Sequence, residues 1–366
     1  MNKKGFTLME LMGVLIILAL LMLLVFPKLI NLIKSSNDTK DDVTRDLIYI
    51  ATENYIKERK NKYISINDRK YCITLKELVD NTDLTENLKL GDEDNIVDTK
   101  SIQVTYQNKF LYDIVDTEDC IDRYANGEVV YFDVDTGAKC SNYTETQSKT
   151  GVKSGCMKFY AFNDDGGETI NLILDHNTTA IIAWNSSGIN AAGPGITEKD
   201  VLYSLKADTA SWVGTETPAN YTMNQTGKNS NAYYTIDYGD YKARLITAQE
   251  IANITGNTTW NETSSTRTYY FDSKMTTANE ACMNGNISEC KYGWLYDRTN
   301  PSCKTYGCLY DSDVETNGYW SASSDAGGTV IAWLVYYTGN LYVDGVDHWG
   351  VYGVRPVIEI LKSKLN

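Results

Sequence analysis

An apolar segment near the N-terminus constrains this chain more than any other feature of its sequence. Between Phe6 and Phe26 only Glu10 is charged, and these roughly 20 residues are enough to cross a hydrocarbon core of about 30 Å as a helix. Lys3 and Lys4 precede the segment, and positive flanking charges stay on the cytoplasmic side. We therefore expect insertion into the cytoplasmic membrane, with the rest of the chain outside.

Glu10 distinguishes this segment from two simpler kinds of apolar segment, a cleaved secretory signal and a plain single-pass anchor. A carboxylate inside a spanning helix costs on the order of 2.5 to 3.5 kcal/mol on insertion scales, so its presence points to a function. A secretory signal would have small residues at a cleavage site after the apolar run, and none stands near Phe26, Pro27 or Lys28. Gly5 lies before the run instead.

Residues 3–10, KKGFTLME, resemble the type III signal of the type IV pilin family. The resemblance implies that a prepilin peptidase cuts after Gly5 and N-methylates Phe6, the new first residue. It implies that Glu10 pairs with the amino group of a neighbouring subunit, which would satisfy a buried carboxylate. Pro27 matches the family's helix-kinking proline, because proline lacks an N–H and clashes with the preceding turn.

The same resemblance implies partners and a location. The expected partners are the prepilin peptidase, other pilin subunits in a homo- or hetero-filament, and an unidentified extracellular ligand or host surface. The chain is expected as a single-pass protein of the cytoplasmic membrane before assembly, and then in an extracellular pilus or at the cell surface.

Length and charge limit the architecture and the ligands of the chain beyond the membrane segment. A chain of 366 residues is too long for one ordinary domain and predicts a stem with two globular parts. Its formal net charge of −14 disfavours direct nucleic-acid binding, since phosphates require a basic face. With 27 Tyr and 26 Gly but only 5 Pro, the body has the composition of turn-rich β structure exposed to water.

All 8 cysteines come after the apolar segment, and an even number outside the cell indicates disulfides. A metal site is the alternative, but the sequence has no Cys-x-x-Cys pair and only 2 histidines. Sequence proximity favours four pairings: Cys72 with Cys120, Cys140 with Cys156, Cys282 with Cys290, and Cys303 with Cys308.

The stem should continue beyond Pro27 as an amphipathic helix. Val43, Leu47, Ile50 and Tyr55 keep a spacing of three and four residues, which predicts an apolar stripe packed on a small β-sheet. Further on, a capping-box pattern at residues 74–77 predicts a short helix. Two segments, 101–106 and 110–115, predict a pair of strands joined by a turn.

A second, larger domain should come after this head. Its expected strands span 128–134, 157–162, 170–174, 320–323, 330–336, 340–343 and 353–358, with short helices near 200–205 and from Thr247. Residues 243–250, 318–323 and 353–357 resemble motifs of the formylglycine-generating-enzyme-like branch of the C-type-lectin-like fold. Within these motifs we expect structural roles for Arg244 and Arg355, bound to buried carboxylates or carbonyls, and for Trp320 and Trp333 in the core.

An enzyme is the main alternative for this domain, because the formylglycine-generating family uses a cysteine pair at its active site. In that family the pair comes after the segment that corresponds to residues 320–323, whereas Cys303 and Cys308 precede it. A structural disulfide is therefore the preferred interpretation of these two cysteines.

The remaining polar residues give no catalytic pattern. His176 and His348 are isolated, and neither HExxH nor GxSxG occurs. Acidic clusters at residues 164–165, 311–313 and 344–347 are interpreted as solvated turns rather than Ca²⁺ sites. We expect no catalytic residue, no metal site and no cofactor.

The sequence thus predicts an α+β protein with a leader at 1–5, a transmembrane and assembly helix at 6–60, a pilin-like head with a small antiparallel sheet at 61–125, and a C-type-lectin-like mixed α/β domain at 126–362. The predicted function is that of a type IV pilin or pilin-like filament subunit that displays an extracellular adhesion or recognition domain. The alternatives are a minor pseudopilin of a type II secretion or DNA-uptake machine, and a surface enzyme of formylglycine-generating type on a pilin-like anchor.

Overall fold

The computed structural model describes residues 40–141, 146–147, 153–179, 181–223, 234–261, 266–271, 290–296, 317–348 and 351–365. The chain divides into two compact units, Met1–Asp122 and Arg123–Asn366. Both units mix α and β structure, with more strands than helices among the described residues. The expected domain boundary after residue 125 lies close to this division.

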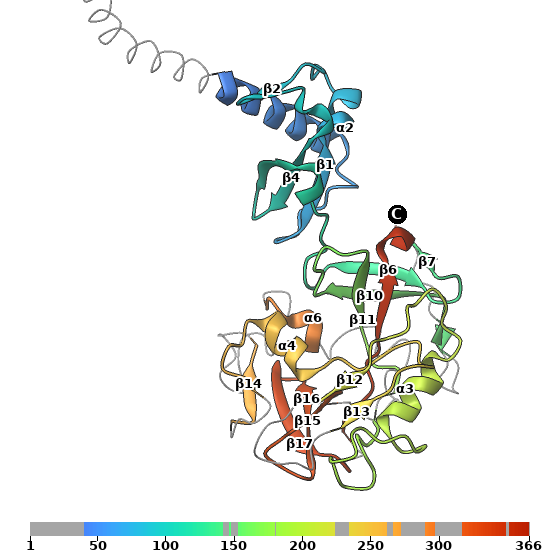
Figure 1. Ribbon diagram of the computed structural model, residues 1–366. Coiled ribbons are helices and arrows are strands. Elements are labelled where there is room, and N and C mark those ends of the chain that lie inside the picture. The colour runs from blue at the N-terminus through green and yellow to red at the C-terminus, as the bar shows by residue number, and fades with distance from the viewer. Residues whose placement is uncertain are drawn as a thin grey trace, which may run out of the picture. The chain divides into compact units, whose positions relative to one another are not determined.

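In the first unit, a helix over residues 40–58 packs on a three-stranded antiparallel sheet of order β1-β4-β5 (Figure 1). The elements after this helix are β1 Lys70–Thr74, α2 Leu75–Asn81, β2 Lys89–Leu90, β3 Glu93–Asp94, η1 Ile96–Asp98, β4 Lys100–Tyr106, β5 Phe110–Asp116 and η2 Thr117–Asp119. The two predicted strands pair as expected, and Asn108 in their turn has a φ of 58°.

The start of α2 follows its local sequence only in part. Thr74 caps the helix, since its hydroxyl accepts a 3.0 Å hydrogen bond from the Glu77 N–H. The Glu77 carboxylate does not return to the cap and accepts a hydrogen bond from the Tyr55 hydroxyl instead. A hydrogen bond from Tyr55, on the helix over residues 40–58, therefore takes the place of the second hydrogen bond of the predicted capping box.

The second unit contains a five-stranded antiparallel sheet of order β18-β11-β10-β6-β7 and a four-stranded antiparallel sheet of order β14-β17-β16-β15. The strands of the first are β6 Val129–Asp133, β7 Ala138–Lys139, β10 Cys156–Phe162, β11 Thr169–Leu174 and β18 Val357–Leu361. Those of the second are β14 Thr268–Tyr270, β15 Gly318–Ser324, β16 Ile331–Tyr336 and β17 Asn340–Gly345. Strand β18 pairs with β11, so a late strand of this unit lies beside an early strand in the same sheet.

Shorter elements complete the second unit. They are β8 Thr146–Gln147, β9 Lys153–Ser154, α3 Val201–Thr209, β12 Tyr221–Thr222, β13 Thr235–Ile236, α4 Ala248–Thr255, α6 Gly293–Tyr296 and η5 Lys362–Leu365. The capping box of α4 forms as predicted, because the Thr247 hydroxyl and the Glu250 carboxylate each accept a hydrogen bond from the other residue's N–H.

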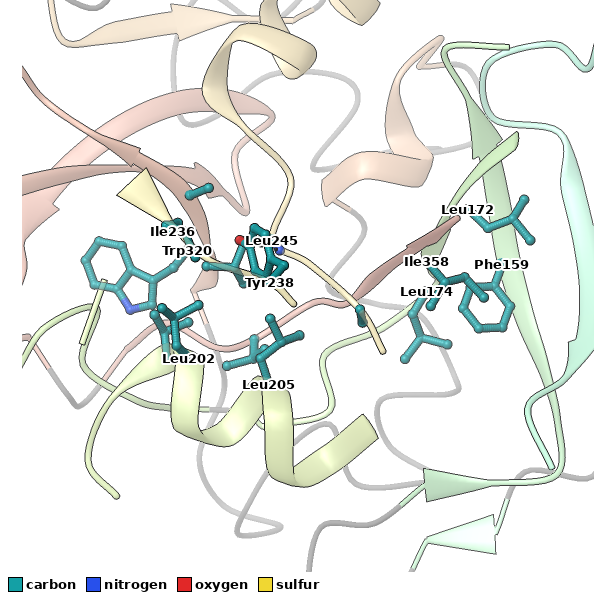
Figure 2. Close-up of a cluster of buried hydrophobic side chains, with 14 of the residues drawn as sticks. Phe159, Leu172, Leu174, Leu202, Leu205, Ile236, Tyr238, Leu245, Trp320 and Ile358 are labelled. Atoms are coloured by element: carbon teal, nitrogen blue, oxygen red, sulfur yellow. Dashed lines mark hydrogen bonds between the residues drawn. The ribbon is translucent and has the colours of Figure 1, made fainter. Parts of the chain in front are cut away.

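The core of the second unit is rich in aromatic side chains (Figure 2). Leu202 and Leu205 lie on one face of α3. They point toward four residues from other elements: Ile236, Tyr238, Leu245 and Trp320. A second group of buried side chains comes from strands of the five-stranded sheet: Phe159, Leu172, Leu174 and Ile358. Trp320 and Trp333 are fully buried, as expected.

Candidate functional site

The helix over residues 40–58 carries apolar side chains on the face turned away from the sheet. Val43, Leu47 and Ile50 are 55, 52 and 56% exposed. At 3.6 residues per turn these three positions share one face of the helix, opposite to positions 48 and 52. The prediction that Val43, Leu47 and Ile50 pack on the sheet is therefore wrong. The sheet covers the face formed by Ile48, Thr52, Tyr55 and Ile56.

We call Val43, Leu47 and Ile50 the exposed stripe. Single exposed apolar residues are normal on a protein surface, whereas a contiguous apolar row on one helical face is a candidate interaction surface. The residues predicted for processing and assembly, namely Gly5, Phe6, Glu10 and Pro27, lie outside the described residues. Among the helices that the structure describes, none is long and apolar enough to cross a membrane.

Two disulfides join the pairs that sequence proximity favours. Cys72 bonds to Cys120 across a separation of 48 residues, and Cys140 bonds to Cys156 across 16. The first links β1 to the segment after η2, and the second links the segment after β7 to β10. Cys290 is also disulfide-bonded. Its predicted partner Cys282, and the predicted pair Cys303 and Cys308, lie outside the described residues.

Arg244 has the structural role that its motif suggests. Its guanidinium donates to both carboxylate oxygens of Glu250, at 2.7 and 2.9 Å, and to the Asn171 side chain at 2.8 Å. Burial raises the pKa of Glu250, but the charge and hydrogen bonds of Arg244 and the bonds from Thr247 outweigh it and leave that pKa below its usual value. Arg244 thereby ties α4 to the five-stranded sheet.

Arg355 is buried and donates to three carbonyl oxygens, those of Leu174, Trp294 and Leu295. These bonds connect the end of β11 to α6, and the guanidinium lies over the ring of Tyr319. Both arginines therefore hold elements together, as expected.

The two histidines have different surroundings. His176 is buried, and its Nδ1 contacts the Asp175 carboxylate, whose other oxygen lies 4.0 Å from Lys158 Nζ. His348 is 56% exposed, and its Nδ1 lies 2.9 Å from Asp344 Oδ1. Both histidines look isolated in the sequence, and the signal that could have indicated these contacts is an aspartate one residue before His176 and four residues before His348.

The interpretation of residues 164–165 as a solvated turn is wrong for Asp164. Its side chain is buried, where it accepts hydrogen bonds from the Tyr124 and Gly166 N–H groups and pairs with Lys362 at 2.6 Å. The cluster at 311–313 lies outside the described residues. Within the parts of the chain that the structure describes, no group of three or more His, Cys, Asp or Glu side chains is arranged to hold a metal ion.

A group of tyrosines lies beside Asp344 at the β16–β17 hairpin, and we call it the tyrosine cluster: Tyr336, Tyr337, Tyr342 and Tyr352. The Tyr336 ring lies 4.5, 5.6 and 6.3 Å from the rings of the other three. The Tyr352 hydroxyl donates a 2.6 Å hydrogen bond to Asp344. Tyr342 is exposed and Tyr352 is buried, so the cluster presents aromatic area to solvent through Tyr342.

The N-terminal residues match a known protein family. The family described as the prokaryotic N-terminal methylation motif matches residues 1–26. No curated protein and no solved structure matches the chain significantly, so the resemblance of residues 126–362 to the C-type-lectin-like fold stays a prediction. The methylation motif fits a membrane-anchored chain that reaches the pilus surface. It supports a type IV pilin-like prepilin, which in general is processed by a prepilin peptidase and assembles with other pilin subunits.

Proposed function

We propose that this chain is a type IV pilin-like filament subunit that assembles through its N-terminal helix and displays a large extracellular binding domain. The observation that carries the assembly part is the exposed stripe, because it lies on the helix that comes after the methylation motif in the sequence. The head sheet leaves this face of the helix uncovered. A second subunit is the partner that the motif predicts for it.

The assembly proposal is tested by replacing Val43 and Leu47 with Ser in the full chain. Burying the exposed half of these two side chains stabilises an interface by about 1 kcal/mol each, so we expect incorporation into filaments to fall by an order of magnitude or more. The readout is mass spectrometry of sheared surface filaments, relative to the chain that stays with the cell. Lys76→Ser, a change at an exposed position on α2 and outside the stripe, is the control and should incorporate normally. Equal incorporation of both variants would contradict the proposal.

The second unit is proposed to act by binding rather than turnover. The tyrosine cluster supports this, because tyrosine supplies rigid contact area together with a hydroxyl and is enriched at recognition surfaces. Cells that display Tyr342→Ala should bind host cells, glycans or matrix proteins several-fold more weakly than wild type. Tyr203→Ala is the control, since Tyr203 is 44% exposed on α3 and has no part in the cluster. An equal loss of binding in both variants would show that the tyrosine cluster is not the binding surface.

A catalytic role for Cys303 and Cys308 makes the opposite prediction. If these residues carry redox or oxygenase chemistry, changing both to Ser should abolish a measurable conversion and leave thermal stability nearly unchanged. As a structural bridge they should instead contribute stability without turnover. Copper-dependent thiol oxidation of a peptide, lost in the double variant without loss of stability, would replace the binding proposal with an enzyme.

A further inference from the structure

A groove in the first unit combines an apolar floor with a rim of lysines. It has a volume of about 690 Å³ and lies between the end of the helix over residues 40–58 and the β4–β5 hairpin. The floor contains Ile56, Tyr63 and Phe110, and the rim contains Lys57, Lys60 and Lys109. Its size is that of a ligand or peptide site.

The charge of this groove is opposite to that of the chain, whose formal net charge is −14. Lys57 pairs with Glu53 at 2.8 Å, whereas Lys60 and Lys109 are exposed and form no ion pair with any described residue. Lysines near a helix C-terminus are favoured by the helix dipole. That explanation does not cover Lys109, which lies in the β4–β5 turn. The groove is thus suited to a partner that brings negative charge.

Negative charge gathers at the other end of the same helix. Asp41 accepts a 2.8 Å hydrogen bond from the Gly91 N–H, which holds the β2–β3 hairpin beside this end. Asp42 and Asp92, the latter at the hairpin tip, are exposed and form no ion pair with any residue that the structure describes. From residue 41 to residue 58 a helix extends about 25 Å, so the acidic hairpin and the lysine groove mark opposite ends of the head.

We propose that the acidic β2–β3 hairpin of one copy, together with Asp42, docks against the lysine-rimmed groove of a second copy. This inference rests on the proposed function as an assembling subunit. The two surfaces differ and lie at opposite ends of one head, so the contact is heterologous and can repeat without closing, as a helical filament requires. The complementary charges orient the approaching subunit and exclude the reversed arrangement.

Charge exchange in the full chain tests the contact. The groove variant carries Lys60→Glu with Lys109→Glu, and the hairpin variant carries Asp42→Lys with Asp92→Lys. Each should lower the amount of chain in sheared filaments by about tenfold, since two attractive pairs become repulsive. A chain that carries all four changes restores complementarity and should recover to within about threefold of wild type. Lys76→Glu with Lys139→Glu, two exposed lysines outside the groove, changes the net charge equally and should assemble normally.

Peptide mapping of the Cys72–Cys120 bridge shows that each variant has folded. A groove variant that assembles as well as the Lys76 and Lys139 control would overturn the inference, and so would a four-site variant no better than its parents. These outcomes leave the proposed function intact, provided that the Val43 and Leu47 variant fails to assemble. Absence of the wild-type chain from filaments would refute both the function and the contact.

Discussion

Replacing Glu250 with Ala should destabilise the second unit strongly, because the change leaves a cation without its partner. Arg244 donates to both oxygens of Glu250, and only 12% of the Arg244 side chain is exposed. After the change, the guanidinium keeps its bonds to Asn171 and to the Leu245 carbonyl but loses the carboxylate that it contacts. The Thr247 N–H also loses its acceptor.

The magnitude can be worked out from these losses. Breaking a buried ion pair from one side costs about 3 to 5 kcal/mol, and the lower figure is appropriate because 21% of the Glu250 side chain is exposed. With a denaturant dependence of about 3 kcal/mol per molar urea for a unit of this size, a loss of about 3 kcal/mol lowers the unfolding midpoint by about 1 M. Glu250→Gln keeps an acceptor for the helix cap and should lose less, about 1 to 2 kcal/mol.

Tryptophan fluorescence in urea is the appropriate assay. All 7 tryptophans come after residue 122, so the signal reports only the second unit. At neutral pH the order of stability should be wild type, Glu250→Gln, Glu250→Ala. Midpoints within about 0.2 M of one another, a difference of about 0.6 kcal/mol at that slope, would refute the argument from a buried pair.

The pH dependence gives an independent check. The pKa of Glu250 is lowered in the folded state, so its stabilisation is fully present above the unfolded value of 4.5 and is lost as the pH falls through the folded pKa. The gap between wild type and Glu250→Gln should therefore shrink on acidification. A constant gap between about pH 7 and about pH 3 would show that the charge of Glu250 does not matter.

Three further changes test other parts of the structure. Cys72→Ser with Cys120→Ser opens a loop of 48 residues and should cost the first unit about 4 kcal/mol in the chain-entropy model, measured by circular dichroism in urea. The two carboxylate oxygens of Asp200 accept separately from the Ser186 and Thr197 N–H groups. Asp200→Asn keeps only one of these acceptors and should cost about 1 to 3 kcal/mol, measured by the fluorescence assay. Burial raises the pKa of Asp200, but those hydrogen bonds outweigh burial and leave this pKa below its usual value of 3.8. The stability cost of Asp200→Asn should therefore fade as the pH drops below that value. Gly127→Ala should lower the urea midpoint of the second unit, because the added Cβ would lie 2.5 Å from the Trp294 ring and φ is 86°.

Local signals in the sequence predicted local structure well. The cap at Thr247 involves residues only three apart, so its pattern is sufficient to place the start of α4. The hairpin of β10 and β11 is similar, because a polar, glycine-containing turn joins two apolar strands. Strand β1 was missed, since residues 70–74 are few and lie next to a strong helix cap.

Features that depend on distant residues could not be read from the sequence. Apolar side chains occupy two faces of the helix over residues 40–58, and its spacing alone does not say which face the sheet covers. Asp164 looks solvated among polar neighbours, but its partner Lys362 lies 198 residues away. The lysine groove could not be predicted either, because only the folded chain brings Lys109 beside Lys57 and Lys60.

Intact-protein mass spectrometry of sheared filaments tests the central claim most directly. A pilin-like subunit processed at its methylation motif should be recovered as a chain that begins with N-methylated Phe6 and carries its disulfides. Recovery from filaments of a chain that still contains Met1 to Gly5, or complete absence of the chain from filaments, would contradict the account.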